Sequence, residues 1–385
     1  MEASIAQSET SVLVPRPPIG YGCLERRCGI SLKTVEVDSV EDAIERAYSE
    51  GWTDGLPVVP PTLGLVQRGL DYLGVEPSEI VGTIPPKNGI ATYGNIVANC
   101  VMGGCLPEHM PVVIAAVRAM LQERFTLNGV QATTNSVAPL VIVSGPIVEQ
   151  LGFNSRWGVF GGGSRANAAV GRAVRLILWN IGGGYPGKID MSTMGHPGKY
   201  AFCIAEDREW NPWLPLHVER GLDEQDSAVT VVATDGPHQI GTGSGYASAE
   251  QVLTVLADSM MTIGNATMNA GGDMVLVVGP MTAQNLAARG YTKASVRLAL
   301  QQLARKPAEL VANCLFYQRP HPYHWSHVMK DPDDPTELVP LIRDVGQVVI
   351  TVAGGMGSGT GFCSFCPGWH QGGGLACTEK IIIPQ

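Results

Sequence analysis

The chain has 385 residues, which is enough for about two domains of ordinary size. Hydrophobic residues make up 45% and charged residues 16%, so the composition excludes a disordered chain and indicates a globular one. The net charge of −9 argues against nucleic acid or an anionic membrane surface as the main partner, because both need basic patches.

No run of about 18 apolar residues occurs, so we expect no transmembrane helix. Residues 1–18 lack a basic segment followed by an apolar run, so we expect no signal peptide either. Nine cysteines in a chain of this size indicate cytosolic thiols and a cytoplasmic protein, not a disulfide scaffold. The low charge fraction and a mean hydropathy slightly above zero favour a homo-oligomer with a buried interface, although a large monomeric core gives the same composition.

Residues 1–35 are polar, aperiodic and proline-containing, so we expect an N-terminal arm that carries Cys23 and Cys28 as free thiols. A helix is expected from Ser39 towards Gly51, because Ser39 can cap it and its first turn is acidic. Further helices are expected at 62–73, 92–101, 107–124, 165–180, 248–262, 281–289 and 293–304. Short apolar, β-branched runs predict strands at 139–144, 229–234, 274–278 and 347–353. Since strands alternate with helices, the pattern predicts an α/β fold of mainly parallel sheets flanked by helices.

An internal echo predicts two pseudo-repeated halves. Ala132-Thr133-Thr134-Asn135 precedes a strand closed by Gly145-Pro146, and Ala266-Thr267-Met268-Asn269 precedes, at the same spacing, a strand closed by Gly279-Pro280. A strand followed by Gly-Pro is also common turn chemistry, so chance similarity is the alternative. We expect a first α/β half at 36–220 and a second at 221–385, which includes a glycine- and cysteine-rich tail. A crevice between the halves would be the natural ligand site, with Asn135 and Asn269 facing each other across it.

Two regions carry candidate substrate-binding groups. Gly161-Gly162-Gly163-Ser164-Arg165 opens the helix at 165–180, where exposed backbone N–H groups and Arg165 suit a carboxylate or phosphate; a simple Ser164 cap is the alternative. The loops at 185–190 and 195–200 place Lys188, His196 and Lys199 in a frame of glycine and proline. His196 is a candidate general acid or base, and Lys188 and Lys199 are candidate substrate-binding residues. Ordinary turns with solvated charges would give the same pattern.

Cys105 lies in Gly103-Gly104-Cys105-Leu106-Pro107, just before the helix at 107–124. A thiol at a helix N-terminus has a lowered pKa and is more often a thiolate, so Cys105 is a candidate nucleophile. A buried, inert thiol is the commoner outcome, and we expect it for Cys100, Cys203 and Cys314.

The C-terminal tail contains Cys363-Ser364-Phe365-Cys366, followed by His370, within a run of glycines. Two thiols at this spacing can oxidise to each other or share a metal ion, with His370 as a further ligand or a base. A zinc or iron site would be completed by Cys377 or by one of three nearby histidines, which are His321, His324 and His327. The tail therefore indicates thiol redox chemistry, a metal site or unremarkable loop thiols, and its spacing alone does not choose between them.

Four further motifs are distinctive. They are Gly51-Trp52-Thr53-Asp54-Gly55-Leu56-Pro57-Val58-Val59-Pro60-Pro61-Thr62, Met102-Gly103-Gly104-Cys105-Leu106-Pro107-Glu108, Gly129-Val130-Gln131-Ala132-Thr133-Thr134-Asn135 and Gly195-His196-Pro197-Gly198-Lys199-Tyr200. Together they resemble the large proteins associated with the UGSC-type (seleno)protein family, whose small companion carries Sec- or Cys-Gly-Ser-Cys. The resemblance implies thiol- or selenol-dependent chemistry on a small molecule, with a separate small redox protein as partner. This chain has no Cys-Gly-Ser-Cys of its own.

We therefore expect an enzyme that acts on a small anionic metabolite by thiol-dependent redox or lyase chemistry. In this hypothesis the nucleophile is Cys105 or Cys363, the resolving thiol is Cys366, the acid or base is His196, and the anion is held by Arg165 and Lys199. Two alternatives stay open. One is a zinc- or iron-dependent hydrolase or lyase that uses the C-terminal Cys/His cluster, and the other is a non-catalytic large subunit that binds substrate for a small redox partner.

Overall fold

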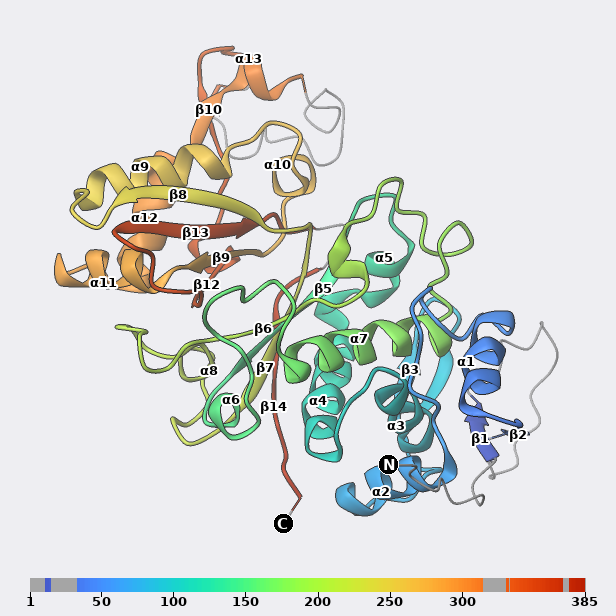
Figure 1. The fold of residues 1–385 in the computed structure, drawn as a ribbon. Coiled ribbons are helices and arrows are strands. Elements are labelled where there is room, and N and C mark those ends of the chain that lie inside the picture. Colours follow the sequence, from blue (N-terminus) through green and yellow to red (C-terminus); the bar gives the residue numbers. More distant parts are fainter. Residues whose placement is uncertain (1–10, 15–32, 314–329, 332, 370–373, 385) are drawn as a thin grey trace.

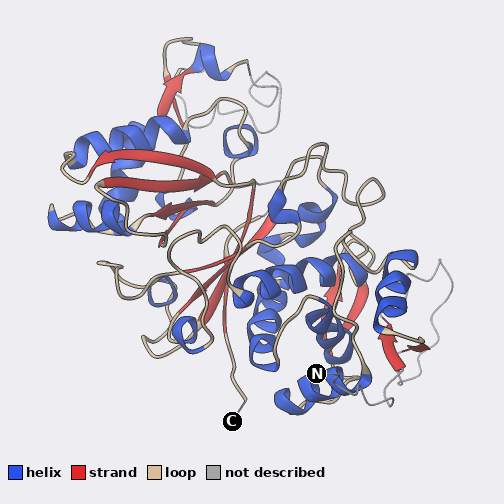
Figure 2. Cartoon of the chain, viewed as in Figure 1, coloured by secondary structure: helices blue, strands red, loops and turns tan. Residues whose placement is uncertain are grey.

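The computed structural model describes residues 11–14, 33–313, 330–331, 333–369 and 374–384 (Figure 1). Two four-stranded sheets organise this part of the chain, and Figure 2 shows helices gathered around each of them. One face of each sheet contributes to a shared apolar cluster, while the opposite faces pack against separate sets of helices. The resulting layers run helices, sheet, sheet, helices, which confirms the expected α/β fold. The sheets are mixed, with one parallel pair in each, so the expectation of mainly parallel sheets is wrong.

The first sheet has the strand order β14-β7-β5-β6. Its strands are β5 (Ala138–Ser144), β6 (Cys203–Ala205), β7 (Ala228–Thr234) and β14 (Cys377–Lys380). Only β5 and β6 run parallel, and the other neighbours are antiparallel. Both β5 and β7 are buried along their whole length, because each is covered on both faces and consists mostly of apolar residues.

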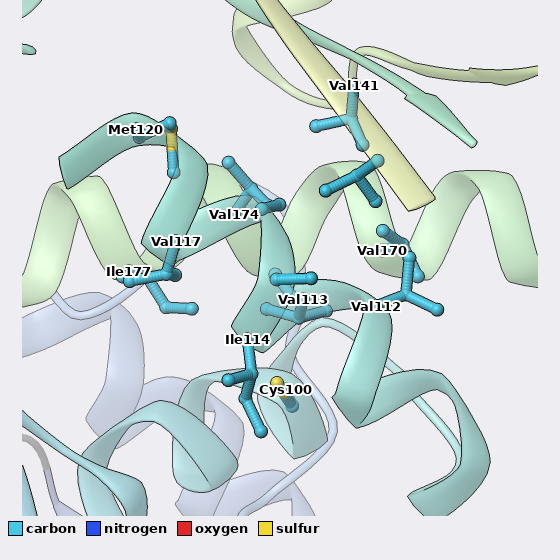
Figure 3. Close-up of a cluster of buried hydrophobic side chains, with 14 of the residues drawn as sticks. Cys100, Val112, Val113, Ile114, Val117, Met120, Val141, Val170, Val174 and Ile177 are labelled. Atoms are coloured by element: carbon cyan, nitrogen blue, oxygen red, sulfur yellow. The ribbon is translucent and has the colours of Figure 1, made fainter. Parts of the chain in front are cut away.

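Three helices cover the outer face of the first sheet: α3 (Tyr93–Met102), α4 (Met110–Leu121) and α7 (Arg165–Asn180). Their apolar side chains form the largest cluster with alternate residues of the sheet. Figure 3 shows valines of α4 and α7 packed around Val141, with Cys100 of α3 at the edge of the group. The wall on which Cys100 lies is therefore packed and apolar.

The second sheet has the order β12-β9-β13-β8. Its strands are β8 (His238–Ser244), β9 (Met274–Val278), β12 (Val348–Val352) and β13 (Thr360–Cys366). Again only one pair, β9 and β12, is parallel. Helices α9 (Ala249–Met260), α11 (Pro280–Ala288) and α12 (Lys293–Leu303) cover its outer face.

The chain passes between the two sheets twice at a crossover, a name we use for residues 235–237 and 367–369. The chain leaves the first sheet after β7 and enters the second as β8, and it leaves the second after β13 and returns to the first as β14. Where the two segments pass, Asp235 N–H donates to Pro367 O at 2.8 Å and Trp369 N–H donates to Ala233 O at 3.2 Å. The second sheet is therefore built wholly from residues 238–366, whereas the first sheet is completed by β14, which follows the second sheet in the chain.

The two sheets have the same order of parallel and antiparallel strand pairs. In the sequence, Gly-x-His-Gln begins within each crossover segment, at Gly236–Gln239 and Gly368–Gln371. The Ala-Thr-x-Asn part of the predicted echo lies differently in its two copies. In the first copy it follows α5 (Leu127–Ala132), and in the second it lies within α10 (Ala266–Ala270). Duplication of the two halves stays a prediction.

Further helices and strands are described outside the two sheets. They are β1 (Ser11–Val14), β2 (Lys33–Glu36), α1 (Val40–Ser49), α2 (Leu63–Leu73), β3 (Ile80–Ile84), β4 (Gly89–Thr92), α6 (Ile147–Gln150), α8 (Leu216–Glu219), β10 (Arg305–Pro307), α13 (Ala308–Val311) and β11 (Leu338–Pro340). Pairing of β1 with β2 means that part of the expected arm at 1–35 is a two-stranded sheet. The predicted boundary at 220/221 precedes β7, although β7 belongs to the first sheet.

The Gly51–Thr62 segment, which is rich in proline, is fixed to α7. Arg172 forms two hydrogen bonds with the Asp54 carboxylate, at 3.0 and 2.8 Å, and donates to the carbonyl groups of Leu56 and Pro57. Asn180 donates to Trp52 O at 2.9 Å. These contacts give the distinctive Trp-Thr-Asp-Gly-Leu-Pro motif a structural role in holding its loop against the helix.

In the part of the chain that the structure describes, no single helix has the length and apolar character needed to cross a membrane. Helix α3 and the segment Pro107–Leu121 meet that test only as a pair, which is bent by 118° at its break.

Candidate functional site

Two clusters of candidate residues emerge from the fold. We call Cys100, Cys105, His109 and Arg165 the thiol cluster, which lies where α3 ends and α7 begins. The second, which we call the crossover cluster, contains Asp190, His196, Lys199, Asp235 and Arg175.

The thiol cluster is built on the C-terminus of α3. Gly104 has a positive φ of 88°, and its N–H donates to Val101 O at 2.9 Å, while Cys105 N–H donates to Cys100 O, also at 2.9 Å. This pair of hydrogen bonds with glycine in the left-handed region is a Schellman motif, in which the side chains at the two ends of the longer bond come into contact. Gly103 packs directly on the backbone of α7, so the turn is held in place. The Gly-Gly pair therefore brings the thiols of Cys100 and Cys105 together.

Cys105 is buried, and a hydrogen bond from the Cys100 thiol lowers its pKa to about 7. His109 and the positive charge of Arg165 lower this pKa further, whereas burial opposes them. Burial raises the pKa of Cys100, and the neighbouring Cys105 adds to that effect. At pH 7 a large fraction of Cys105 is therefore a thiolate, beside a protonated Cys100 that donates to it.

His109 and Arg165 fix the surroundings of this thiolate. The Nδ1 atom of His109 accepts a hydrogen bond from Leu106 N–H at 3.2 Å, which leaves Nε2 to carry the hydrogen of the neutral ring. Arg165 is exposed at the first position of α7, and its Nε donates to Gly104 O at 3.0 Å. The expected Ser164 cap is present, because its side chain accepts from Asn167 N–H. Arg165 and the start of a 16-residue helix thus present positive charge beside Cys105.

The crossover cluster is held by a buried carboxylate. The Asp190 carboxylate accepts hydrogen bonds from Lys199 Nζ at 2.7 and 2.8 Å and from Arg175 at 3.1 Å. All three side chains are largely buried. Burial lowers the pKa of Lys199, while Asp190 acts in the opposite direction. Lys199 is therefore committed to an internal ion pair, and its predicted role in holding a substrate anion has a structural competitor.

His196 lies against the start of the crossover. Its Nδ1 accepts from Gly198 N–H at 3.1 Å, and its ring packs on Gly236 and edge-on against Phe202. Burial, then the charge of Lys199, lowers the pKa of His196 to about 4, although the backbone at Thr234 acts in the opposite direction. The imidazole is neutral at pH 7, which suits a hydrogen-bonding role better than that of a base.

Asp235 follows β7 directly and was not singled out by the sequence. Burial raises the pKa of its carboxyl to about 6, against the effects of the Ala266 backbone N–H and Lys199. Its negative charge in turn lies close enough to Cys366 to raise the pKa of that thiol, after the larger effect of burial. Cys366, in the tail, is thus a protonated, fully buried thiol beside Asp235.

The two clusters are separated by the first sheet. Phe202 and Cys203 are consecutive, and successive side chains of an extended strand point to opposite faces. Phe202 contacts His196 and belongs to the cluster between the sheets, whereas Cys203 belongs to the outer cluster and interacts with Cys105. Cys105 and His196 therefore do not form one site, contrary to our combination of the two as nucleophile and acid or base.

Cys363 and Cys366 do not act as a pair. They lie on β13, where a spacing of three places them on opposite faces, since the side-chain period of a strand is two. Cys363 packs with helices α9 and α11, and Cys366 packs between the sheets. Burial raises the pKa of Cys363 to about 11. We therefore withdraw their roles as nucleophile, resolving thiol and shared metal ligands, because the sheet backbone lies between them.

The proposed metal ligands are only partly within the described chain. His321, His324, His327 and His370 lie outside the described residues. Among the residues that are described, no group of three or more His, Cys, Asp or Glu side chains is placed to hold a metal ion. Cys23, Cys28 and Cys314 also lie outside the described residues.

The other candidate substrate-binding residues are dispersed. The Asn135 side chain bonds to its neighbour Thr133 at 3.1 Å, which is local turn chemistry. Lys188 is exposed, with its ammonium 5.8 Å from the ring centre of Tyr185. Asn269 lies in α10, and the position of its side chain is outside what the structure describes. Neither Asn135 nor Lys188 joins the thiol cluster.

Comparisons with protein-family models, with curated proteins and with solved structures found no match.

Proposed function

We propose that this chain is an enzyme that acts on a small anionic metabolite by thiol-dependent chemistry, with Cys105 as the nucleophile. The observation that carries the proposal is the environment of Cys105, where a thiol donor, an imidazole and a guanidinium surround one sulfur atom. Of the thiols that the structure describes with a shifted pKa, Cys105 alone has a lowered one. A thiolate at neutral pH is the reactive form of cysteine.

Two neighbours supply the rest of the proposed chemistry. Arg165, at the start of α7, would hold the negative group of the substrate next to the sulfur atom. His109 replaces His196 as the proposed acid or base, since it is the imidazole that lies beside Cys105. The small redox partner implied by the UGSC-type resemblance, a homo-oligomer and a cytoplasmic location stay predictions.

The metal-dependent alternative loses its main support, because Cys363 and Cys366 point to opposite faces of β13. A non-catalytic large subunit stays an alternative. It would need no reactive thiol, so it differs from our proposal in what it predicts for Cys105.

The proposal can be tested with two alkylating agents that differ in charge, iodoacetate and neutral iodoacetamide. The rate of each reaction at Cys105 is followed by mass spectrometry of the tryptic peptide 88–118, in folded protein and in urea-unfolded protein. We expect the iodoacetate-to-iodoacetamide rate ratio to be at least several-fold higher in the folded protein, because Arg165 attracts the anionic reagent.

The matched variants are Arg165→Met and Arg68→Met, which remove an arginine inside and outside the cluster; both arginines are exposed. Only Arg165→Met should return the ratio to its unfolded value. A ratio that is the same in the folded and unfolded protein, or that is equally sensitive to both variants, would overturn the assignment of an anion-binding thiol site.

A further inference from the structure

The C-terminal turn of α3 holds two thiols in contact, and only one of them has a role in the proposed function. Cys100 is fully buried on the last turn of the helix, and Cys105 follows the Gly-Gly pair. Both are free thiols. The hydrogen bond from Cys100 to Cys105 requires a sulfur or hydroxyl donor at position 100.

The backbone of the turn limits how far apart the two residues are. Cys105 N lies 2.9 Å from Cys100 O. With standard bond lengths, their Cα atoms are then at most about 7 Å apart. Disulfides span Cα separations of roughly 4.4–6.8 Å. The Schellman motif directs both side chains to the same side of the turn, so the pair is close to bonding geometry without any movement of secondary structure.

We propose that Cys100 and Cys105 form a reversible disulfide, with Cys105 as the sulfur that is attacked first by oxidant and Cys100 as the resolving thiol. This bond would switch off the Cys105 nucleophile under oxidising conditions. The consequence for activity rests on the proposed function, whereas formation of the bond does not.

The oxidant we infer is hydrogen peroxide, since Cys105 is only 7% exposed and a small reagent reaches it more readily than a bulky one. The Cys105 thiolate attacks one peroxide oxygen, the O–O bond breaks, and hydroxide leaves and takes up a proton to become water. The sulfur, oxidised by two electrons, is now a sulfenic acid. The Cys100 sulfur then attacks the Cys105 sulfur, the S–O bond breaks, and hydroxide leaves with the Cys100 proton as a second water. Two equivalents of a small thiol return both cysteines to the reduced state.

Cys203 is the competing thiol. Its interaction with Cys105 places it nearby, but it lies on β6, where its backbone is fixed by pairing with Val141 of β5. Burial raises its pKa well above the ordinary range, with Cys105 adding to the shift. Neither feature favours attack on an oxidised Cys105. Cys203→Ser is therefore a matched control, because it removes a second buried thiol near Cys105.

The test treats the full chain with one equivalent of hydrogen peroxide at pH 7, blocks remaining thiols with N-ethylmaleimide and digests it with trypsin. Cys100 and Cys105 occur in the same peptide, 88–118, because trypsin cuts after Lys87 and Arg118. We expect this peptide to lose the mass of two hydrogens and to carry no N-ethylmaleimide. After reduction with dithiothreitol, both cysteines of this peptide should react with N-ethylmaleimide.

In Cys100→Ser the disulfide cannot form, so we expect the Cys105 sulfenic acid to accumulate, as measured by its adduct with dimedone. Its yield should rise from near zero to most of the peptide, whereas Cys203→Ser should behave like the unchanged protein. A disulfide from Cys105 to Cys203, or no disulfide while Cys105 is oxidised further, would overturn the inference. Disulfide formation without any preference for iodoacetate would leave this inference standing and reject the anion site alone.

Discussion

Asp235 is a carboxyl group whose environment opposes its ionisation. Burial raises its pKa from 3.8 to about 6, although Lys199 and a backbone N–H favour the charged form. An acid whose pKa is raised on folding binds its proton more tightly in the folded state, so the free energy of unfolding falls as pH rises from about 4 to 6 and is constant above that. The residue is a source of instability at neutral pH.

We predict that Asp235→Asn stabilises the protein at pH 7 but not at pH 4. The shift corresponds to about 3 kcal/mol at most, and because the carboxyl is partly exposed we expect about 1–2 kcal/mol. Asparagine can still accept the hydrogen bond from Ala266 N–H. Urea denaturation of both proteins at pH 4 and pH 7 measures the difference, and equal effects at the two pH values would show that burial of the charge is not the cause.

At the residue scale, the sequence identified Cys105 and Arg165 correctly as neighbours of a helix N-terminus, but it missed Cys100 as their partner. The signal was available, because Cys100 and Cys105 flank Gly103-Gly104, and glycine after a helix end is typical of a Schellman motif. Asp190, Arg175 and Asp235 carried no such signal. Their clustering depends on contacts between segments far apart in the chain.

At the scale of single elements, the turn after α3 decides the chemistry of the thiol cluster. Gly104 has φ of 88°, a conformation that costs an L side chain about 1 kcal/mol or more. If the turn opens, the contact between the two thiols is lost, and with it the main cause of the lowered pKa of Cys105.

We predict that Gly104→Ala destabilises the protein by about 1 kcal/mol and shifts the pH midpoint of Cys105 alkylation upward from about 7. Gly158→Ala is the matched control. Gly158 also has a positive φ, 69°, and a Cβ at either position would meet no atom within 4 Å. Both variants should lose stability, but only Gly104→Ala should change the midpoint. A midpoint that is unchanged in Gly104→Ala would separate the turn from the thiol chemistry.

The helices and the four apolar strands were predictable because their periodicity and caps are local. The expected helix at 165–180, for example, is α7 with its Ser164 cap. By contrast, β8 and β13 contain glycine and alternate with polar residues, so they gave no apolar β-branched run. Because β13 was not recognised, the Cys-x-x-Cys spacing was interpreted as a loop motif. On a strand, the same spacing places the two thiols on opposite faces of the sheet.

At the scale of the whole molecule, the return of the chain to the first sheet as β14 ties the two sheets together. Without β14, the first sheet exposes the edge of β7, and Cys377 and Ile381 lose their burial. Exposed strand edges also promote association. No local pattern predicted that β14 pairs with β7, since the paired residues are more than a hundred positions apart.

We predict that ending the chain at Gly374 destabilises it by at least about 4 kcal/mol, because the buried side chains of Ala376, Cys377 and Ile381 and the β7–β14 ladder are lost. Ending the chain at Ile381 is the control. It keeps β14 and removes the exposed Ile382 and Ile383, so we expect a change below about 1 kcal/mol. Urea denaturation measures the free energy of unfolding of both truncated chains. Similar values for the two would mean that β14 does not hold the sheets together.

The pH dependence of Cys105 alkylation by iodoacetamide tests the central claim most directly. The rate is read from the peptide 88–118 between pH 5 and pH 10. We predict a rise with a midpoint at about pH 7, because Cys100, His109 and Arg165 stabilise the thiolate in the folded protein. A midpoint near the ordinary value of 9, or no reaction until the protein unfolds, would contradict a reactive thiol at Cys105 and the function proposed from it.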